Sequence, residues 1–134
     1  MKKVMVKNRL GILCAAVLFF LAAGCQSAAP GYKTITAAQG KQMMDSGGPY
    51  TLVDVRTADE YQQGHIPGAE LIPVDTIAAR AGTDLPNKSA VILVYCRSGA
   101  RAATAARALV SMGYTSVYDL GGIINWSYDL VTGD

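Results

Sequence analysis

Cysteine and histidine are scarce in this chain of 134 residues, which contains three cysteines and one histidine. Cys14 and Cys25 belong to the N-terminal segment discussed below, so Cys96 stands alone in the rest of the chain. Once that segment is removed and Cys25 is modified, Cys96 has no partner for an internal disulfide. One thiol and His65 also make a zinc cluster implausible, because structural zinc sites combine several such ligands.

Nucleotide-binding patterns and a strong excess of either positive or negative charge are missing as well. The chain has no Walker loop, no dinucleotide fingerprint and no internal repeat, so we expect one domain without a cofactor or a bound metal. It has 12 basic and 10 acidic residues, net +2, but four of the basic residues (Lys2, Lys3, Lys7 and Arg9) lie in the N-terminal segment. The remainder has 8 basic and 10 acidic residues, net −2. This balance gives no support for a nucleic-acid partner, and we expect the protein to be a monomer.

Residues 1–24 have the pattern of an export signal. After the basic start, an apolar run of 14 residues extends from Leu10 to Ala23, a length that suits a signal peptide and is short for a membrane-spanning helix. The ending Leu21-Ala22-Ala23-Gly24-Cys25 resembles the bacterial lipobox, although Ala22 stands where leucine is usual. This resemblance implies cleavage before Cys25 and lipidation of Cys25. An uncleaved membrane anchor is the alternative.

A lipid on Cys25 would attach the protein to a membrane outside the cytoplasm. Residues 25–31 would then form a lipid-anchored linker, and residues 32–134 the folded domain. Gln26 replaces the aspartate associated with inner-membrane retention in many Gram-negative bacteria. The expected location is therefore the periplasmic face of the outer membrane in a Gram-negative cell, or the plasma membrane surface in a Gram-positive one.

Apolar runs that alternate with helix patterns predict an α/β domain with a parallel sheet and right-handed crossovers. Thr36 with Gln39, and Thr57 with Glu60, have the capping-box spacing of helix starts. The predicted strands cover residues 32–35, 50–56, 69–74, 90–95 and 115–120. The predicted helices follow Thr36 and Thr57, cover 75–81 and 101–113, and include a short one within 121–131, with a loop at 82–89.

Cys96 lies between the most apolar predicted strand and the strongest predicted helix. Ligands of open α/β sheets bind beyond the carboxyl ends of the strands. Gly99 lets the following loop curl so that its amides form an anion nest, and the helix start with Arg97 and Arg101 adds positive charge. The loop amides, the helix start and the two arginines favour the thiolate form of Cys96, which is the nucleophilic form. The alternative is that Cys96 is an inert buried residue at the end of a strand. In that case the two neighbouring arginines would have no function.

Two stretches, LVDVRTADEYQQGHIPGAELIP at 52–73 and residues 92–126 with the loop CRSGAR, resemble the rhodanese-like domain. The resemblance covers nearly the whole mature chain. It implies a rhodanese-like α/β fold, with a five-stranded parallel sheet and helices on both faces. It also implies a sulfurtransferase in which Cys96 takes a sulfane sulfur from a donor such as thiosulfate, becomes a persulfide, and passes the sulfur to a thiol or cyanide.

The resemblance also suggests roles for the loop residues. Cys96 would be the nucleophile, and backbone N–H groups of the loop would stabilise the negative charge of the terminal sulfur. Arg97 is expected at the cleft mouth, where it would attract an anionic donor, whereas Arg101 either contacts the substrate or braces the loop. The predicted substrate-binding residues are Arg97, Ser98, Gly99, Ala100 and Arg101.

Asp54 and Arg56 follow a neighbouring strand and are predicted to support the site. Asp54 would either form a structural pair or hold one of the loop arginines. His65, in the sequence GHIPGA, is expected to lock a turn through a hydrogen bond and to take no part in the chemistry. The resemblance does not assign it a catalytic role.

Three functions remain open at this point. The first is the sulfurtransferase, with a thiol acceptor that could be a thioredoxin-like protein. The second is a module that carries persulfide or docks a redox partner without turnover. The third is an arsenate reductase or phosphatase. Relatives of the same fold with those activities use a loop one residue longer than the six residues from Cys96 to Arg101, which favours sulfur transfer.

Overall fold

The computed structural model of the chain describes residues 31–134. The predicted signal peptide (1–24), the predicted lipidation site Cys25 and nearly all of the linker (25–31) lie outside the described residues. Among residues 31–134, no helix combines the length and apolar character needed to cross a membrane.

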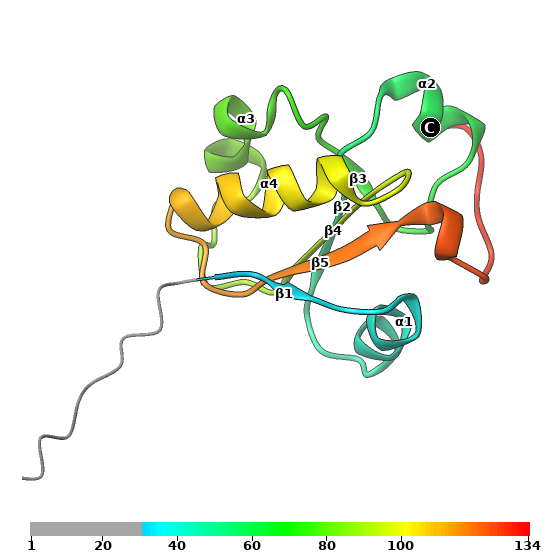
Figure 1. The fold of residues 1–134 in the computed structure, drawn as a ribbon, viewed down its shortest axis with the longest axis horizontal. Coiled ribbons are helices and arrows are strands. Elements are labelled where there is room, and N and C mark those ends of the chain that lie inside the picture. Colours follow the sequence, from blue (N-terminus) through cyan, green and yellow to red (C-terminus); the bar gives the residue numbers. More distant parts are fainter. Residues whose placement is uncertain (1–30) are drawn as a thin grey trace, which may run out of the picture.

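Five parallel strands form one sheet in the order β1-β5-β4-β2-β3 (Figure 1). Their bounds are Lys33–Thr34 (β1), Thr51–Asp54 (β2), Glu70–Leu71 (β3), Ile92–Cys96 (β4) and Val117–Gly122 (β5). β4 is central and buried along its whole length, because strands flank it on both sides and helices cover both faces. This position explains its continuous apolar sequence. The predicted five-stranded parallel sheet is confirmed.

The helices lie on both faces of the sheet, as expected. Their bounds are Ala37–Asp45 (α1), Ala58–Gln63 (α2), Ile77–Asp84 (α3) and Ala100–Ser111 (α4), followed by the 3-10 helix η1, Ile123–Asn125. Figure 1 shows α3 and α4 on one face and α1 on the other. Apolar side chains of α3 and α4 pack with Cys96 in one core cluster, and Trp126 packs against a second cluster.

Both predicted capping boxes form. The Gln39 N–H donates to Thr36 Oγ1 at 3.1 Å, and the Thr36 N–H donates back to Gln39 Oε1 at 2.9 Å. The same exchange joins Thr57 and Glu60, at 3.3 and 3.0 Å. Each box needs only residues within one turn, so local sequence is sufficient to predict it.

Several predicted boundaries differ from the observed ones, and β3 covers only Glu70–Leu71 of the predicted residues 69–74. The third helix begins at Ile77 and continues to Asp84, although residues 75–81 were the predicted helix and Gly82 the start of a loop. Burial of Ile77, Ala81 and Leu85 in the core outweighs the low helix propensity of that glycine. The last strand extends to Gly122 because its end pairs with the end of β4. This extension brings β5 next to Cys96.

The residues after η1 return to α2 and form what we call the C-terminal strap, Ser127–Asp134. Val131 and His65 exchange backbone hydrogen bonds at 2.8 and 2.9 Å, and the Gly133 N–H donates to Gln62 O at 3.0 Å. Figure 1 shows this red segment running from η1 to the C-terminus beside α2. The strap therefore continues the fold beyond the sheet and covers the end of α2.

Candidate active site

Cys96 is the last residue of β4, and α4 begins four residues later at Ala100. Gly99 connects them with φ at +112°, a left-handed conformation that favours glycine. This turn directs the Gly99 N–H at Cys96 Sγ, to which it donates at 2.9 Å. The Cys96 side chain is buried, with 1% of the residue exposed. The sulfur thus lies at the carboxyl end of the central strand, next to the start of α4.

The end of β5 supports the cysteine loop from one side. A Cβ atom at Gly122 would lie 2.3 Å from Arg97 O and 2.7 Å from Ser98 Cα, both too close for a side chain. The Ile124 N–H also donates to Arg97 O at 3.3 Å. Glycine at 122 is therefore required by the approach of the loop backbone. In the sequence, Gly122 is predicted only as part of the closing segment 121–131, and its role beside the cysteine loop is not predicted.

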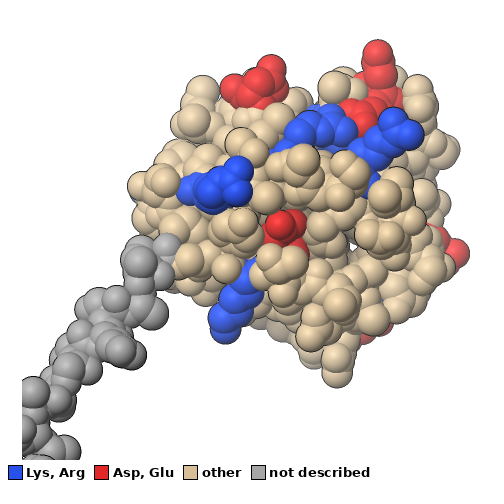
Figure 2. All heavy atoms as spheres, viewed as in Figure 1, with Lys and Arg blue, Asp and Glu red and all other residues tan. Residues whose placement is uncertain are grey.

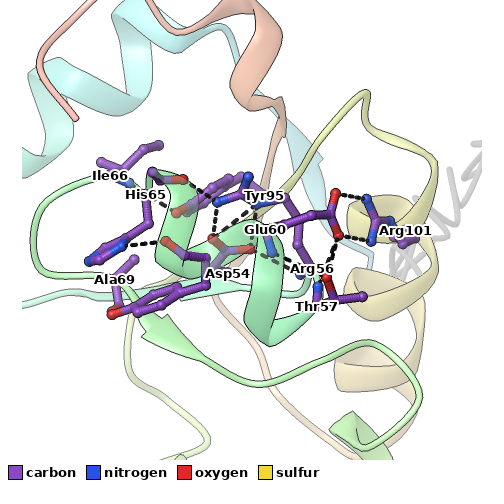
Figure 3. Close-up of polar contacts among 11 residues, drawn as sticks. Asp54, Arg56, Thr57, Glu60, His65, Ile66, Ala69, Tyr95 and Arg101 are labelled. Carbon is purple, nitrogen blue, oxygen red and sulfur yellow. Dashed lines mark hydrogen bonds and ion pairs between the residues drawn. The ribbon is translucent and has the colours of Figure 1, made fainter. Parts of the chain in front are cut away.

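Arg101 forms a two-pronged ion pair with Glu60 (Figure 3). Its Nη1 donates to Glu60 Oε2 at 2.8 Å, and its Nη2 donates to Oε1 at 2.9 Å. Because Glu60 also caps α2 through Thr57, this contact joins the first turn of α4 to the first turn of α2. The arrangement supports the bracing role that the sequence left open for Arg101. Glu60 itself was predicted only as a capping residue.

The hydrogen bonds from Arg101 have a direct consequence for the protonation of Glu60. They are the largest of the interactions that lower the Glu60 pKa from 4.5 to about 2. A carboxyl group with a lowered pKa in the folded state adds stability at pH values above its unfolded pKa. That contribution is lost as the pH falls from about 4.5 toward 2.

We expect acidification across this interval to lower the free energy of unfolding by about 1–2 kcal/mol through Glu60, a value discounted because the pair is partly exposed. Urea unfolding at a series of pH values measures it. The Glu60→Gln variant should lose this part of the pH dependence. Asp59→Asn, an exposed neighbour in the same helix, should retain it, and an unchanged slope in Glu60→Gln would contradict the assignment.

Asp54 and Arg56 form a buried ion pair beside the loop. Arg56 Nη2 donates to Asp54 Oδ2 at 2.7 Å, and its Nε lies 3.0 and 3.1 Å from the two carboxylate oxygens. Arg56 Nη2 also donates to Gly64 O at 2.7 Å. Asp54 pairs with Arg56 and with neither loop arginine, so the structural role is the one observed.

His65 belongs to the turn that follows α2. Its Nδ1 donates to Tyr61 O at 2.9 Å, and its ring stacks on the Tyr61 ring with centroids 3.6 Å apart. The next residue, Ile66, donates its backbone N–H to the hydroxyl of Tyr95 at 3.1 Å. Burial raises the pKa of Tyr95 well above its usual range. These contacts hold the turn in place, as the sequence predicts for His65.

A cavity of about 410 Å³ borders the loop at Arg97. Within residues 31–134, no carboxylate lies at ion-pair distance from the Arg97 guanidinium, whose residue is exposed. On the face shown in Figure 2, basic atoms lie among acidic and uncharged ones over α4 and α2. The cavity is lined by Arg56, Glu60, Gln63, Gly64, Arg97, Ile123, Ile124 and Leu130.

A second cavity, of about 460 Å³, lies between α1 and the start of the strap. Its lining includes Lys41, Tyr50 and Trp126 but none of the loop residues, so it lies apart from Cys96. The part of the chain described here also contains no cluster of three or more His, Cys, Asp or Glu side chains that could hold a metal ion.

Comparisons of this chain with family models, with curated proteins and with solved structures agree on one family. The family model of the rhodanese-like domain matches residues 36–129. The thiosulfate sulfurtransferase PspE of Escherichia coli is 37% identical over 81 residues, which cover 60% of this chain and 78% of that protein. A sulfurtransferase of Allochromatium vinosum is 44% identical over 77 residues, 57% of this chain and 70% of that protein.

A solved structure shows the same fold. The rhodanese-like domain protein of Staphylococcus aureus superimposes with a TM-score of 0.67 at 33% identity, covering 76% of this chain and 99% of that one. The agreement extends over the sheet and its helices. The resemblance inferred from the motifs at Asp54–Arg56 and Cys96–Arg101 therefore rests on the fold as well.

Proposed function

Because the chain belongs to the rhodanese-like domain family, we propose that it is a sulfurtransferase that moves a sulfane sulfur from a donor such as thiosulfate to a thiol or to cyanide. The observation that carries this proposal is the Gly99 N–H donating at 2.9 Å to Cys96 Sγ. A backbone N–H and the start of α4 beside one sulfur would stabilise negative charge that develops there during sulfur transfer. Such a sulfur is suited to nucleophilic attack.

The proposed reaction has two steps. In the first, the Cys96 thiolate attacks the sulfane sulfur of thiosulfate, a new S–S bond forms, and sulfite leaves with the electrons of the broken S–S bond. In the second, the acceptor attacks the terminal sulfur of the persulfide and the Cys96 thiolate leaves. With cyanide the product is thiocyanate. No external oxidant or reductant is required.

The neighbouring residues would divide the remaining tasks. Arg97, which has no carboxylate partner among residues 31–134, supplies a positive charge at the cavity mouth, and this charge favours the approach of an anionic donor. Backbone N–H groups of the loop, including that of Gly99, would stabilise the terminal sulfur of the persulfide. Arg101 would act as a positioning residue, since both of its terminal nitrogens bind Glu60. Asp54 at the end of β2 and Arg56 just after it would support the site through their ion pair.

Mass spectrometry after incubation with thiosulfate tests the proposal. We expect the purified full-length chain to gain the mass of one sulfur atom, and peptide mapping to place that sulfur on Cys96. Addition of cyanide should remove the sulfur and release thiocyanate. A chain that gains no sulfur from thiosulfate, or gains it only on another cysteine, would contradict the proposal.

The burial of Cys96 favours a second candidate, a persulfide carrier with slow turnover. With 1% of the residue exposed, the terminal sulfur could be shielded from small acceptors and released only to a docked protein, for example one of the thioredoxin type. The same experiment separates the two functions. Rapid discharge to cyanide or a small thiol supports the enzyme, whereas a stable persulfide supports the carrier.

A further inference from the structure

The second cavity, between α1 and the start of the strap, is rich in aromatic side chains. Tyr50, Trp126 and Tyr128 line it, and its volume of about 460 Å³ falls within the range of pockets for organic ligands, about 300–1,000 Å³. Tyr50 is 38% exposed and Tyr128 is 39% exposed. Exposed aromatic surface gathered in one cavity indicates a ligand that covers it.

Trp126 offers a ligand mainly its ring. The indole N–H is already in use, because it donates to Asp129 O at 3.4 Å. The Trp126 and Tyr128 rings form an edge-to-face pair, with their centroids 4.9 Å apart and their planes at 66°. The face of an aromatic ring carries negative electrostatic potential, which attracts cations. The two rings therefore form an angled wall that suits a positively charged group.

A cation of the protein itself already lies against one of these rings. The Lys41 ammonium is 5.6 Å from the centroid of the Tyr128 ring, inside the limit of about 6 Å for attraction between a cation and a ring. The same ammonium donates to Asp45 Oδ1 at 2.6 Å and also to Oδ2. This contact is an independent indication that the cavity stabilises positive charge next to an aromatic side chain.

The charged residues of the cavity leave one carboxylate over. They are Lys41, Asp45 and Asp129, and Lys41 pairs with Asp45. No basic side chain in the described part of the chain lies at ion-pair distance from Asp129. An anionic ligand would be repelled by this excess negative charge, whereas a cation would be attracted.

The hydrogen-bond acceptors of the cavity distinguish one kind of cation from another. A primary ammonium has three N–H donors, and each needs an acceptor when the group leaves water. Both carboxylate oxygens of Asp45 already accept from Lys41. A quaternary ammonium has no N–H group, so aromatic rings and one negative charge are sufficient for it. We infer that this cavity binds the trimethylammonium group of a choline-type cation, with Trp126 and Tyr128 as its wall and Asp129 as its counter-charge.

This binding site is separate from the proposed sulfur transfer, because no residue of the loop from Cys96 to Arg101 lines the cavity. The Cys96→Ser variant should therefore bind the cation as the wild type does. A trimethylammonium group is present both in free choline-type compounds and in the phosphocholine head group of lipids. The two sources share the chemistry that the cavity recognises, and the experiment below distinguishes them.

Trp126 is the single tryptophan of the chain, so its fluorescence reports on the cavity. The test titrates the full-length chain with choline chloride, at an ionic strength held constant with sodium chloride. We expect a saturable change in fluorescence. The neutral isostere 3,3-dimethylbutan-1-ol, which has the same shape without the charge, should bind about tenfold more weakly. Equilibrium dialysis with labelled choline measures the same affinity without relying on a spectroscopic signal.

Four variants test the assigned roles. Tyr128→Leu should weaken choline binding about tenfold, whereas Tyr128→Phe, which keeps the ring, should stay within about twofold of the wild type. Asp129→Asn should weaken it about threefold, because it removes the counter-charge. Lys41→Gln should strengthen it about threefold, because a competing cation leaves the ring. Asp59→Asn, which removes an exposed carboxylate of α2 outside the cavity, is the matched control and should bind choline as the wild type does.

The outcomes are decisive in both directions. Equal affinities for choline and its neutral isostere would show that the cavity selects apolar shape alone, and the inference would be wrong. It would also be wrong if dialysis detected no choline binding, or if Tyr128→Leu bound choline as tightly as the wild type. Glycerophosphocholine identifies the source of the ligand. Tighter binding than choline indicates a lipid head group, and weaker binding indicates a free cation.

Discussion

The Cys96→Ser variant is expected to take up no sulfur from thiosulfate and to lower thiocyanate formation by about 10³-fold or more. A serine hydroxyl at this position can still accept the Gly99 N–H, which now donates to Sγ at 2.9 Å. It cannot form a persulfide, however, so the sulfur has no covalent carrier. Steady-state turnover with cyanide and mass spectrometry of the incubated chain measure the two losses.

A control variant at the C-terminal end of α4 tests whether the loss of activity is specific to Cys96. Ser111 ends α4 and is exposed, and Ser111→Ala should retain wild-type turnover. Cys96 is the one cysteine among the described residues, but Cys14 and Cys25 precede them. Peptide mapping must therefore accompany the assay. Wild-type turnover in Cys96→Ser would remove Cys96 from the mechanism.

Asp54→Ala is expected to lower the free energy of unfolding by about 3–5 kcal/mol, because it leaves the Arg56 charge buried without its partner. Asp54 is completely buried, and its carboxylate accepts hydrogen bonds from both the side chain and the backbone N–H of Arg56. The loss is large compared with the stability of typical domains, about 5–15 kcal/mol. Urea unfolding at low temperature measures it.

A double-mutant cycle distinguishes the ion pair from general damage to the core. In the Asp54→Ala/Arg56→Met variant neither charge of this pair remains, so it should be more stable than Asp54→Ala and should fold even if the single variant does not. The summed losses of the two single variants should exceed the loss in the double variant by about 1–3 kcal/mol. Additive losses would show that the two side chains do not stabilise each other.

Much of the fold could be predicted because the relevant interactions are local. The capping boxes at Thr36 and Thr57 are patterns within one helical turn. The apolar sequence of β4 indicates a strand buried on both faces. The boundary of α3 could not be predicted in this way. Its last turn is stabilised by packing of Leu85 in the core, which outweighs the weak helix propensity of Gly82.

The candidate site shows the same division. The position of Cys96 between a buried strand and a helix, and the need for glycine at 99, follow from adjacent residues. The partner of Arg101 does not, since Glu60 is 41 residues away in the sequence. The contact between Gly122 and the backbone of Arg97 likewise depends on β5 lying next to β4. No local pattern around Glu60 or Gly122 indicates these contacts.

By itself, the amino-acid sequence determined the α/β class, the parallel sheet and the loop that places Cys96 at the start of a helix. These features depend on apolar periodicity, capping and turns, whose energies come from residues a few positions apart. Only the tertiary structure decided that Glu60 holds Arg101, that Asp54 holds Arg56, and that the C-terminal strap brings Leu130 to the cavity mouth. Those contacts form because distant segments meet at one edge of the sheet, and their energies depend on burial and distance that arise only on folding.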